Sequence, residues 1–422
     1  MFQRKAGLAV ALLGAAFVGA LTLGPLPGRE ALVRATPLWC LVCGELGGVD
    51  VLLNVLLFAP LGIGLGLLGV RPGRAFLLAA ALSLSVELLQ LKVVAGRDAS
   101  LSDLLTNSAG VLLGHRLGHS WRGWVLPDPS TARRLVAAWA VTWLALGMGT
   151  AAALRPVPTH DRWYGQWAPE LGHLEKFEGR VCAVRLGDIA LPSWRLTDSV
   201  DWAQRLVSDT VRLRADANLG PATPGLAPIA SIFDEHQREI MLLGQWGSDA
   251  VIRVRMTPSL LRLRPWAMRL PGGLAQPPGT PVSIEAGIED RAYVIRVHSE
   301  GATRARVLPF SPQWTWAALL PVDYAFGRET GVVTALWLAA MLSPLGWWAG
   351  RARGRIPVLA GVVLVAGIAG IRMLFGLSPA PPAEWIGALG GLGVGLLLAH
   401  GVRVPHVAAI DPAELRNPAV DR

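Results

Sequence analysis

The stretch GRDASLSDLLTNSAGVLLG, residues 96–114, decides how this chain folds. Most of it has the apolar character of a membrane helix, yet Asp103 and Asn107 lie four residues apart and so share one helix face. Charged and amide side chains are costly in a bilayer, so we expect both to face polar groups of neighbouring helices. Gly110 and Gly114 continue the same stripe and predict the close approach of a second helix.

Composition places the chain among integral membrane proteins. Of its 422 residues, 52% are hydrophobic and 16% are charged, and the mean hydropathy is +0.43, a combination typical of that class. The formal net charge of +9 is compatible with nucleic-acid binding, but the arginines stand in short clusters between apolar runs. This is the pattern of membrane topology and not of a phosphate-binding face, so no nucleic-acid partner is expected.

Membrane spans are predicted from the apolar runs, because a helix crosses a bilayer with roughly 20 apolar residues. Arg4 and Lys5 precede the first run, as in a cleaved signal peptide, but its 21 residues are long for that purpose and a retained span is expected. Gly387, Gly391 and Gly395 form another row of small residues that predicts tight helix packing. Eight spans are predicted, near residues 6–26, 51–70, 75–94, 101–118, 134–154, 328–349, 356–376 and 385–402.

The orientation is predicted from the short loops, which carry more Lys and Arg on the cytoplasmic side of a membrane. With the N-terminus in the cytoplasm, twelve such residues fall inside and four outside. This predicts a plasma-membrane protein with both termini cytoplasmic and with residues 155–327 outside. The inner set is Arg4, Lys5, Arg71, Arg74, Arg116, Arg122, Arg133, Arg134, Arg351, Arg353, Arg355 and Arg403, and the outer set is Arg29, Arg34, Lys92 and Arg97.

The segment 155–327 predicts an all-β sandwich. Polar and apolar residues alternate in several short runs, which Pro- and Gly-rich turns separate. The segment is long enough for a hydrophobic core of its own. The alternating runs are 210–217, 251–256, 260–264 and 293–299, and the most prominent turn is 270–281.

The stretch IASIFDEHQREIMLLGQWGSDAVIRVRM (229–256) and the strands after it resemble the concanavalin A-like, LamG-type jelly-roll domains. The resemblance implies an extracytoplasmic jelly roll that binds carbohydrate, such as cell-wall glycan. Hydrolases of this fold need an acid and a nucleophile about 5–5.5 Å apart. The nearest carboxylates in sequence are Glu285 and Glu289, without an acidic residue between them, so binding is expected and not hydrolysis.

A carbohydrate patch is predicted beside the runs of this domain. The aromatic ring of Trp246 is suited to stacking on a sugar, and its polar neighbours are suited to hydrogen bonding. Ordinary anchoring of loops is the alternative. The patch comprises His236, Gln245, Trp246 and Asp249.

Two further spans each present a polar pair like that of Asp103 and Asn107. Asp50 and Asn54 are four residues apart, and Glu87 and Gln90 are three apart, so each pair shares a helix face. With a rise of about 1.5 Å per residue, the lower members of these pairs lie roughly 6–10 Å below the outer surface.

Agreement in depth predicts a pocket between the second, third and fourth spans, open to the outside. Facing one another, the acids and amides can satisfy each other's hydrogen bonds. A structural network and a binding site are both compatible with this pattern. The predicted pocket comprises Asp50, Asn54, Glu87, Gln90, Arg97, Asp103 and Asn107.

Three ordered blocks, DVLLNVLLFAPLGIGLG (50–66), SVELLQ (85–90) and residues 96–114, resemble the VanZ-like membrane domain over about residues 10–120. The namesake of that family is associated with low-level resistance to teicoplanin, and the domain has no agreed catalytic activity. The resemblance therefore implies a class of envelope protein and not a reaction. The matching residues are Asn54, Phe58, Pro60, Gly62, Glu87, Gln90, Gly96, Arg97, Asp103, Asn107, Gly110 and Gly114.

Together these patterns predict a multi-domain protein: a polytopic α-helical membrane bundle of about eight spans with an all-β jelly-roll sandwich. The predicted parts are a VanZ-like domain of four spans (1–125), a fifth span (126–154), the sandwich (155–327), a C-terminal hairpin plus one span (328–403) and a cytoplasmic tail (404–422).

The leading hypothesis is a non-enzymatic protein that holds the head group of a membrane lipid, a lipid-linked glycan or a lipoglycopeptide. An intramembrane transferase is the first alternative, with Glu87 or Asp103 as general base and Arg97 holding a phosphate. A membrane scaffold for protein partners is the second.

Metal and cofactor motifs are not expected. His115 and His119 stand in H-R-L-G-H, which lacks the catalytic Glu of H-E-x-x-H, and they are expected at the cytoplasmic interface. Cys40 and Cys43 form one pair and Cys182 stands alone, too few for a four-ligand zinc site. An oxidised pair and two half-buried thiols are both compatible with the spacing. No cofactor, metal or catalytic residue is therefore predicted.

Overall fold

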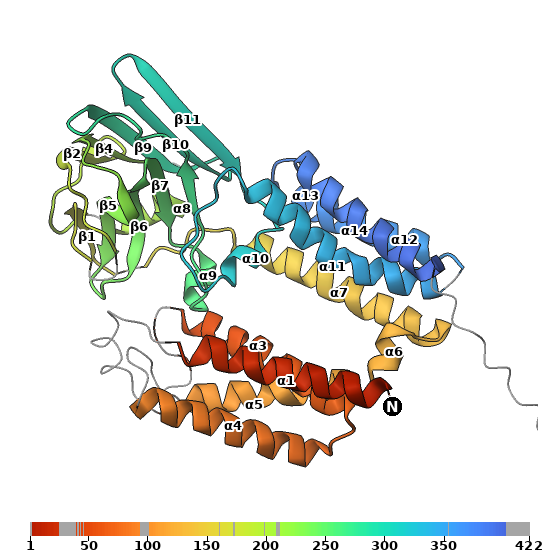
Figure 1. Ribbon diagram of the computed structural model, residues 1–422. Helices are drawn as coiled ribbons and strands as arrows, with labels where there is room; N and C mark the ends of the chain where they lie inside the picture. Colours follow the sequence, from red (N-terminus) through yellow and green to blue (C-terminus); the bar gives the residue numbers. More distant parts are fainter. Residues whose placement is uncertain are drawn as a thin grey trace, which may run out of the picture.

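The protein consists of two helical units and a β-sandwich (Figure 1). The structure is a computed structural model that describes residues 2–24, 39, 42, 44, 46–92, 101–159, 161–171, 174–197, 199–207, 212–352 and 354–401. Arg97, Cys40, Cys43 and the tail 404–422 lie outside the described residues.

The N-terminal unit contains four helices that alternate in direction: α1 (Phe2–Thr22), α3 (Gly47–Leu67), α4 (Pro72–Lys92) and α5 (Leu101–His119). Their apolar residues form one core, with Val18, Phe58, Ala75, Ala79 and Val111 fully buried. The unit covers the segment that carries the predicted polar pocket.

Helices α3 and α5 pack backbone against backbone. A Cβ on Gly110 or Gly114 of α5 would overlap the carbonyl oxygen of Val55 or Ala59 of α3, and a Cβ on Gly62 would overlap that of Val111. Small residues are required wherever two helix axes approach so closely. The close approach predicted from Gly110 and Gly114 is therefore confirmed.

The C-terminal unit follows a short connecting helix and packs around a second core, separate from the first. Asp128 caps its first long helix by accepting hydrogen bonds from the N–H groups of Ser130 and Thr131. Gly391 packs against the carbonyl of Ala339 on the neighbouring helix, as its row of glycines predicted. The elements are α6 (Trp121–Val125), α7 (Pro129–Ala153), α11 (Thr330–Ala352), α12 (Ile356–Val365), the π-helix η1 (Ala366–Gly370), α13 (Ile371–Phe375) and α14 (Pro382–Gly401).

Seven helices among the described residues are long and apolar enough to cross a membrane, which indicates a multi-pass membrane protein. Helix α5 lies outside this set, although it is 19 residues long and packs along α3. Its polar residues lower its apolar character. Eight spans therefore remain a prediction.

Residues 163–309 contain two antiparallel sheets, which confirms the predicted all-β sandwich. One sheet has the order β1 (Trp163–Trp167), β5 (Thr223–Asp234), β6 (Glu239–Gly247), β7 (Asp249–Val254) and β8 (Ala267–Leu270). The other has the order β11 (Ala302–Pro309), β10 (Ala292–Ser299), β9 (Pro281–Glu289), β4 (Arg212–Asn218), β2 (Arg180–Leu186) and β3 (Ile189–Ala190). The short helices α8 (Ser199–Val207), α9 (Thr257–Leu260) and α10 (Thr315–Ala318) accompany them.

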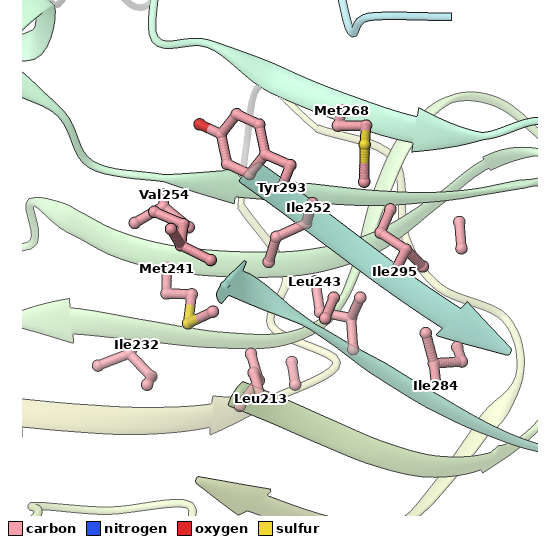
Figure 2. Packing of buried hydrophobic residues seen from close by; sticks show 14 of the residues in the cluster. Leu213, Ile232, Met241, Leu243, Ile252, Val254, Met268, Ile284, Tyr293 and Ile295 are labelled. Carbon is pink, nitrogen blue, oxygen red and sulfur yellow. The ribbon is translucent and has the colours of Figure 1, made fainter. Parts of the chain in front are cut away.

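Alternating side chains from both sheets fill the sandwich (Figure 2). Leu213 and Ile284 come from one sheet, Met241 and Ile252 from the other, and all four are buried. Tyr293 lies among them and donates its hydroxyl hydrogen to Trp266 O at 2.9 Å. Burial raises the pKa of Tyr293 well above its usual range.

The predicted strand at 260–264 is wrong. Pro258 stands in the first turn of α9, where its missing N–H is tolerated and its fixed φ favours a helical turn. The following residues form a turn in which Arg262 has a positive φ of 53°. Alternation alone did not distinguish this exposed turn from a strand.

The sandwich adjoins the same end of both helical units (Figure 1). On the N-terminal unit, the N–H of Gly48 donates to Arg262 O at 3.1 Å. On the C-terminal unit, the guanidinium of Arg291 donates to Phe375 O at the end of α13. We call this the sandwich end of the helices; the N-terminus of α1 lies at the opposite end.

A pair of glycine variants tests the packing of α3 on α5. Gly114→Ala should lower stability by about 1–3 kcal/mol, because its Cβ overlaps the α3 backbone and both helices must shift. Gly19→Ala on α1, where a Cβ meets no atom within 4 Å, should leave stability unchanged or raise it by about 0.5–1 kcal/mol through helix propensity. Thermal unfolding in detergent measures both, and equal melting temperatures would contradict the packing.

Candidate functional site

The predicted polar residues meet between the helices of the N-terminal unit. The amide of Asn54 on α3 donates to Asp103 Oδ1 on α5 at 2.6 Å. The amide of Asn107, one turn further along α5, donates to Ser83 Oγ on α4 at 2.9 Å. The first amide thus links α3 to α5, and the second links α5 to α4.

Gln90 extends this network to a fourth helix. Its side-chain amide donates to the carbonyl oxygen of Thr22 at 2.9 Å. Thr22 is the last residue of α1, where a backbone carbonyl has no partner within the helix. The network therefore also caps α1.

Burial differs among the polar residues of α3, α4 and α5. Asp50 is exposed, Asn54 and Asp103 are half-buried, and Asn107 is 3% exposed. Glu87 is 7% exposed, so its carboxylate belongs to the interior and does not lie on the outer surface of the bundle. The half-buried pair, Asn54 and Asp103, therefore lies nearer the sandwich end of α3 and α5 than the buried Asn107.

Two oxygens in the buried part keep unused acceptor capacity. Gln90 Oε1 and Asn107 Oδ1 are buried and accept no hydrogen bond from the described residues. Buried acceptors without a donor are costly and rare. With the carboxylates of Glu87 and Asp103, they make the site rich in acceptors and suited to a ligand that donates from hydroxyl or N–H groups.

Ser83 and Thr22 are site residues that sequence reasoning missed. Ser83 lies four residues before Glu87 and therefore on the same face of α4, which is a readable signal. The role of Thr22 uses its backbone carbonyl and carries no sequence signal.

The structure does not bring the predicted carbohydrate patch together. Trp246 and Asp249 face each other across β6 and β7, but His236 lies beyond the other end of β6, on the order of 25 Å away at about 3.3 Å per residue. Gln245 is 1% exposed and donates to Pro221 O at 3.1 Å and to Gly247 O at 3.0 Å. Asp249 accepts the N–H of Gly272 at 2.7 Å. Gln245, Trp246 and Asp249 thus lie in strands, and not in polar loops.

Glu285 and Glu289 are held by two arginines. Arg212 contacts one oxygen of each carboxylate at 2.9 Å, and Arg296 contacts them at 3.5 and 3.0 Å. Both carboxylates therefore act as ion-pair partners within the sheet surface.

Asp161, Asp234 and His236 form the one group of potential metal ligands found among the described residues. The guanidinium of Arg238 lies between the two acids, donating to Asp234 Oδ2 at 2.6 Å and also to Asp161. A fixed positive charge already occupies the place of a cation, so the group does not fit a metal.

The surroundings of Asp234 favour the ionised form of its carboxyl group. Burial by itself would raise the pKa of Asp234, but the backbone N–H groups of Arg238 and His236 and the Arg238 guanidinium all bond to the carboxylate and lower it overall. The carboxylate thereby fixes the turn between β5 and β6.

A buried ion pair in the C-terminal unit was not predicted. Arg372 and Glu384 are 2% and 3% exposed, and their side chains meet at 2.7 Å. Ser311 of the sandwich donates to Glu384 Oε1 at 2.6 Å. Charged residues within apolar runs are the signal that could have revealed this pair; it joins the sandwich to the C-terminal helices.

The remaining predicted residues lie apart from the site. His115 is buried near the far end of α5 and bonds to Val70 O at 2.7 Å, while His119 stacks on it with ring centroids 6.1 Å apart. Cys182 is exposed and free.

Comparison with known proteins covers the N-terminal unit alone. Residues 21–122 match the family model described as VanZ/LLP1. This segment contains α3, α4, α5 and thus the polar network. No curated protein and no solved structure matches the chain.

The Asp234 turn supplies a pH-dependent prediction. Because the folded pKa of Asp234 is lowered, its contribution to stability is present above the unfolded value of about 3.9 and is lost as the pH falls through the folded pKa. Asp234→Asn should therefore destabilise the protein by about 1–3 kcal/mol at pH 7. The difference in melting temperature from the wild type should shrink below about pH 4; a constant difference would contradict the lowered pKa.

Proposed function

We propose that the polar network of the N-terminal unit binds the head group of an amphiphile, such as a lipid-linked glycan or a lipoglycopeptide. The observation that carries this proposal is the hydrogen bond between Asn54 and Asp103, two half-buried side chains beside the buried Asn107. A head group with hydroxyl or amide N–H donors can replace Asn54 as the donor to Asp103.

Simple packing accounts less well for this arrangement. A network that served only to hold α3, α4 and α5 together would be expected to satisfy its buried groups, yet Gln90 Oε1 and Asn107 Oδ1 have no donor among the described residues. The half-buried carboxylate of Asp103 would also be costly against lipid. Both features favour a site that receives a polar ligand.

The position of the sandwich supports a ligand that carries sugars. The half-buried pair of Asn54 and Asp103 lies toward the same end of the helices as the sandwich. The balance of Lys and Arg in the loops favours the outer side of the plasma membrane for this end. An amphiphile anchored there could present its sugars to the sandwich, and the VanZ-like segment is compatible with a role in glycopeptide resistance.

A binding experiment with carboxylate variants tests the proposal. Full-length protein in nanodiscs would be titrated with a polyprenyl-phosphate-linked disaccharide and, separately, with teicoplanin. Asp103→Asn and Glu87→Gln keep the shape of each side chain but remove its charge, and each should weaken binding about tenfold or more, because a charge-assisted hydrogen bond contributes about 1.5–3 kcal/mol.

Ser85→Ala is the matched control, because Ser85 lies on the exposed face of α4 and, among the described residues, bonds within its own helix. It should leave binding unchanged. If the carboxylate variants stay folded and bind both probes like the wild type, the proposal is wrong.

A further inference from the structure

The six-stranded sheet carries a hollow on the face turned away from the sandwich core. Its volume is about 540 Å³. Its walls are the ends of β2, β4 and β9 and the hairpin between β10 and β11. We call it the distal groove, because it lies at the end of β10 opposite Arg291, about 20 Å further from the helices at about 3.3 Å per residue.

One row of polar side chains crosses the floor of the distal groove. Asp216 of β4 faces Ser283 of β9, Ser283 faces His298 of β10, and His298 faces Thr303 of β11. Directly opposed residues on one face of a sheet have Cβ atoms about 4.5–5.5 Å apart. Four hydrogen-bonding side chains therefore stand side by side across neighbouring strands.

Two irregularities coincide with this row. A bulge in β2 lies between Val181 and Ala183, at the strand beside Asp216, and it leaves Cys182 as an exposed part of the groove wall; bulges commonly re-aim side chains beside functional sites. Ser283 Oγ is buried between its neighbours and has no hydrogen-bond partner among the described residues.

The charges around the distal groove limit its ligand. None of the described residues that line it is Lys or Arg, whereas Asp216 and Glu300 are acidic, so a phosphate or another anion is disfavoured. Arg214 already contacts Asp216 at 3.4 Å, and Ser283, Thr303 and His298 offer donors as well as acceptors. That mixture suits hydroxyl groups, which both donate and accept, better than a cation.

We infer that the distal groove binds a neutral, hydroxyl-rich saccharide. This inference rests on one part of the proposed function, namely that the sandwich contacts sugars. It places the sugar on the six-stranded sheet and not beside Trp246. The groove wall contains no Phe, Tyr or Trp among the described residues, so hydrogen bonds hold the sugar and the expected affinity is in the millimolar range.

Saturation-transfer NMR on the full-length protein tests this inference. The protein would be kept in nanodiscs without glycosidic detergents, and the probes would be chitotriose, maltotriose and trilysine. At least one trisaccharide should bind, and Asp216→Ala and His298→Ala should each weaken it about tenfold, as expected for the loss of one good hydrogen bond. Thr303→Arg, at an exposed edge position, should block the groove without disturbing the core.

His400→Ala is the matched control, because His400 is equally an exposed histidine but lies on α14, outside the sandwich; it should bind like the wild type. Absence of trisaccharide binding at about 10 mM, equal binding by folded groove variants, or binding of trilysine alone would each overturn the inference. Asp103→Asn separates the two sites. It should leave trisaccharide binding intact, so failure at the membrane site and failure at the groove are distinguishable.

Discussion

The close backbone contact between α3 and α5 is the constraint on which the polar site depends. At Gly62, Gly110 and Gly114, a carbonyl of one helix lies where a side chain of the other would otherwise be. This proximity lets the short side chains of Asn54 and Asp103 meet across the interface. Any larger residue in the row would separate the helices, and the amides and carboxylates would lose the partners that make them tolerable in a membrane.

The sandwich is attached unequally to the two helical units. On the C-terminal side, Ser311 reaches the buried pair of Arg372 and Glu384, and an aromatic cluster continues from the sandwich core toward α11. On the N-terminal side, the turn after α9 contacts Gly48, and its Arg262 guanidinium donates to Val42 O. Breaking the buried pair would leave an uncompensated charge, so the first attachment is costly to disrupt. The sandwich is therefore attached more strongly to the C-terminal helices than to the N-terminal unit that carries the polar network.

The sequence predicted which face of a helix or strand carries a side chain better than it predicted which residues that side chain contacts. The i,i+3 and i,i+4 spacings placed Glu87, Gln90 and Asn107 correctly toward the interior, because helix geometry relates spacing to face directly. The alternation that predicted β7 and β10 also predicted a strand at 260–264, where Pro258 instead begins a helical turn. Closeness in sequence gave a wrong expectation in one further case. His236 and Trp246 are ten positions apart, but they lie near opposite ends of β6.

Apolar helices, an alternating β segment and polar stripes on three of the helices could all be read from the sequence, because they follow from local periodicity. Tertiary structure alone decided that Asn107 bonds to Ser83, that Gln90 caps α1, and that Asp216, Ser283 and His298 form one row. Helix rotation and strand register are set by packing between distant segments, and a shift of one residue would turn each of these side chains away from its partner.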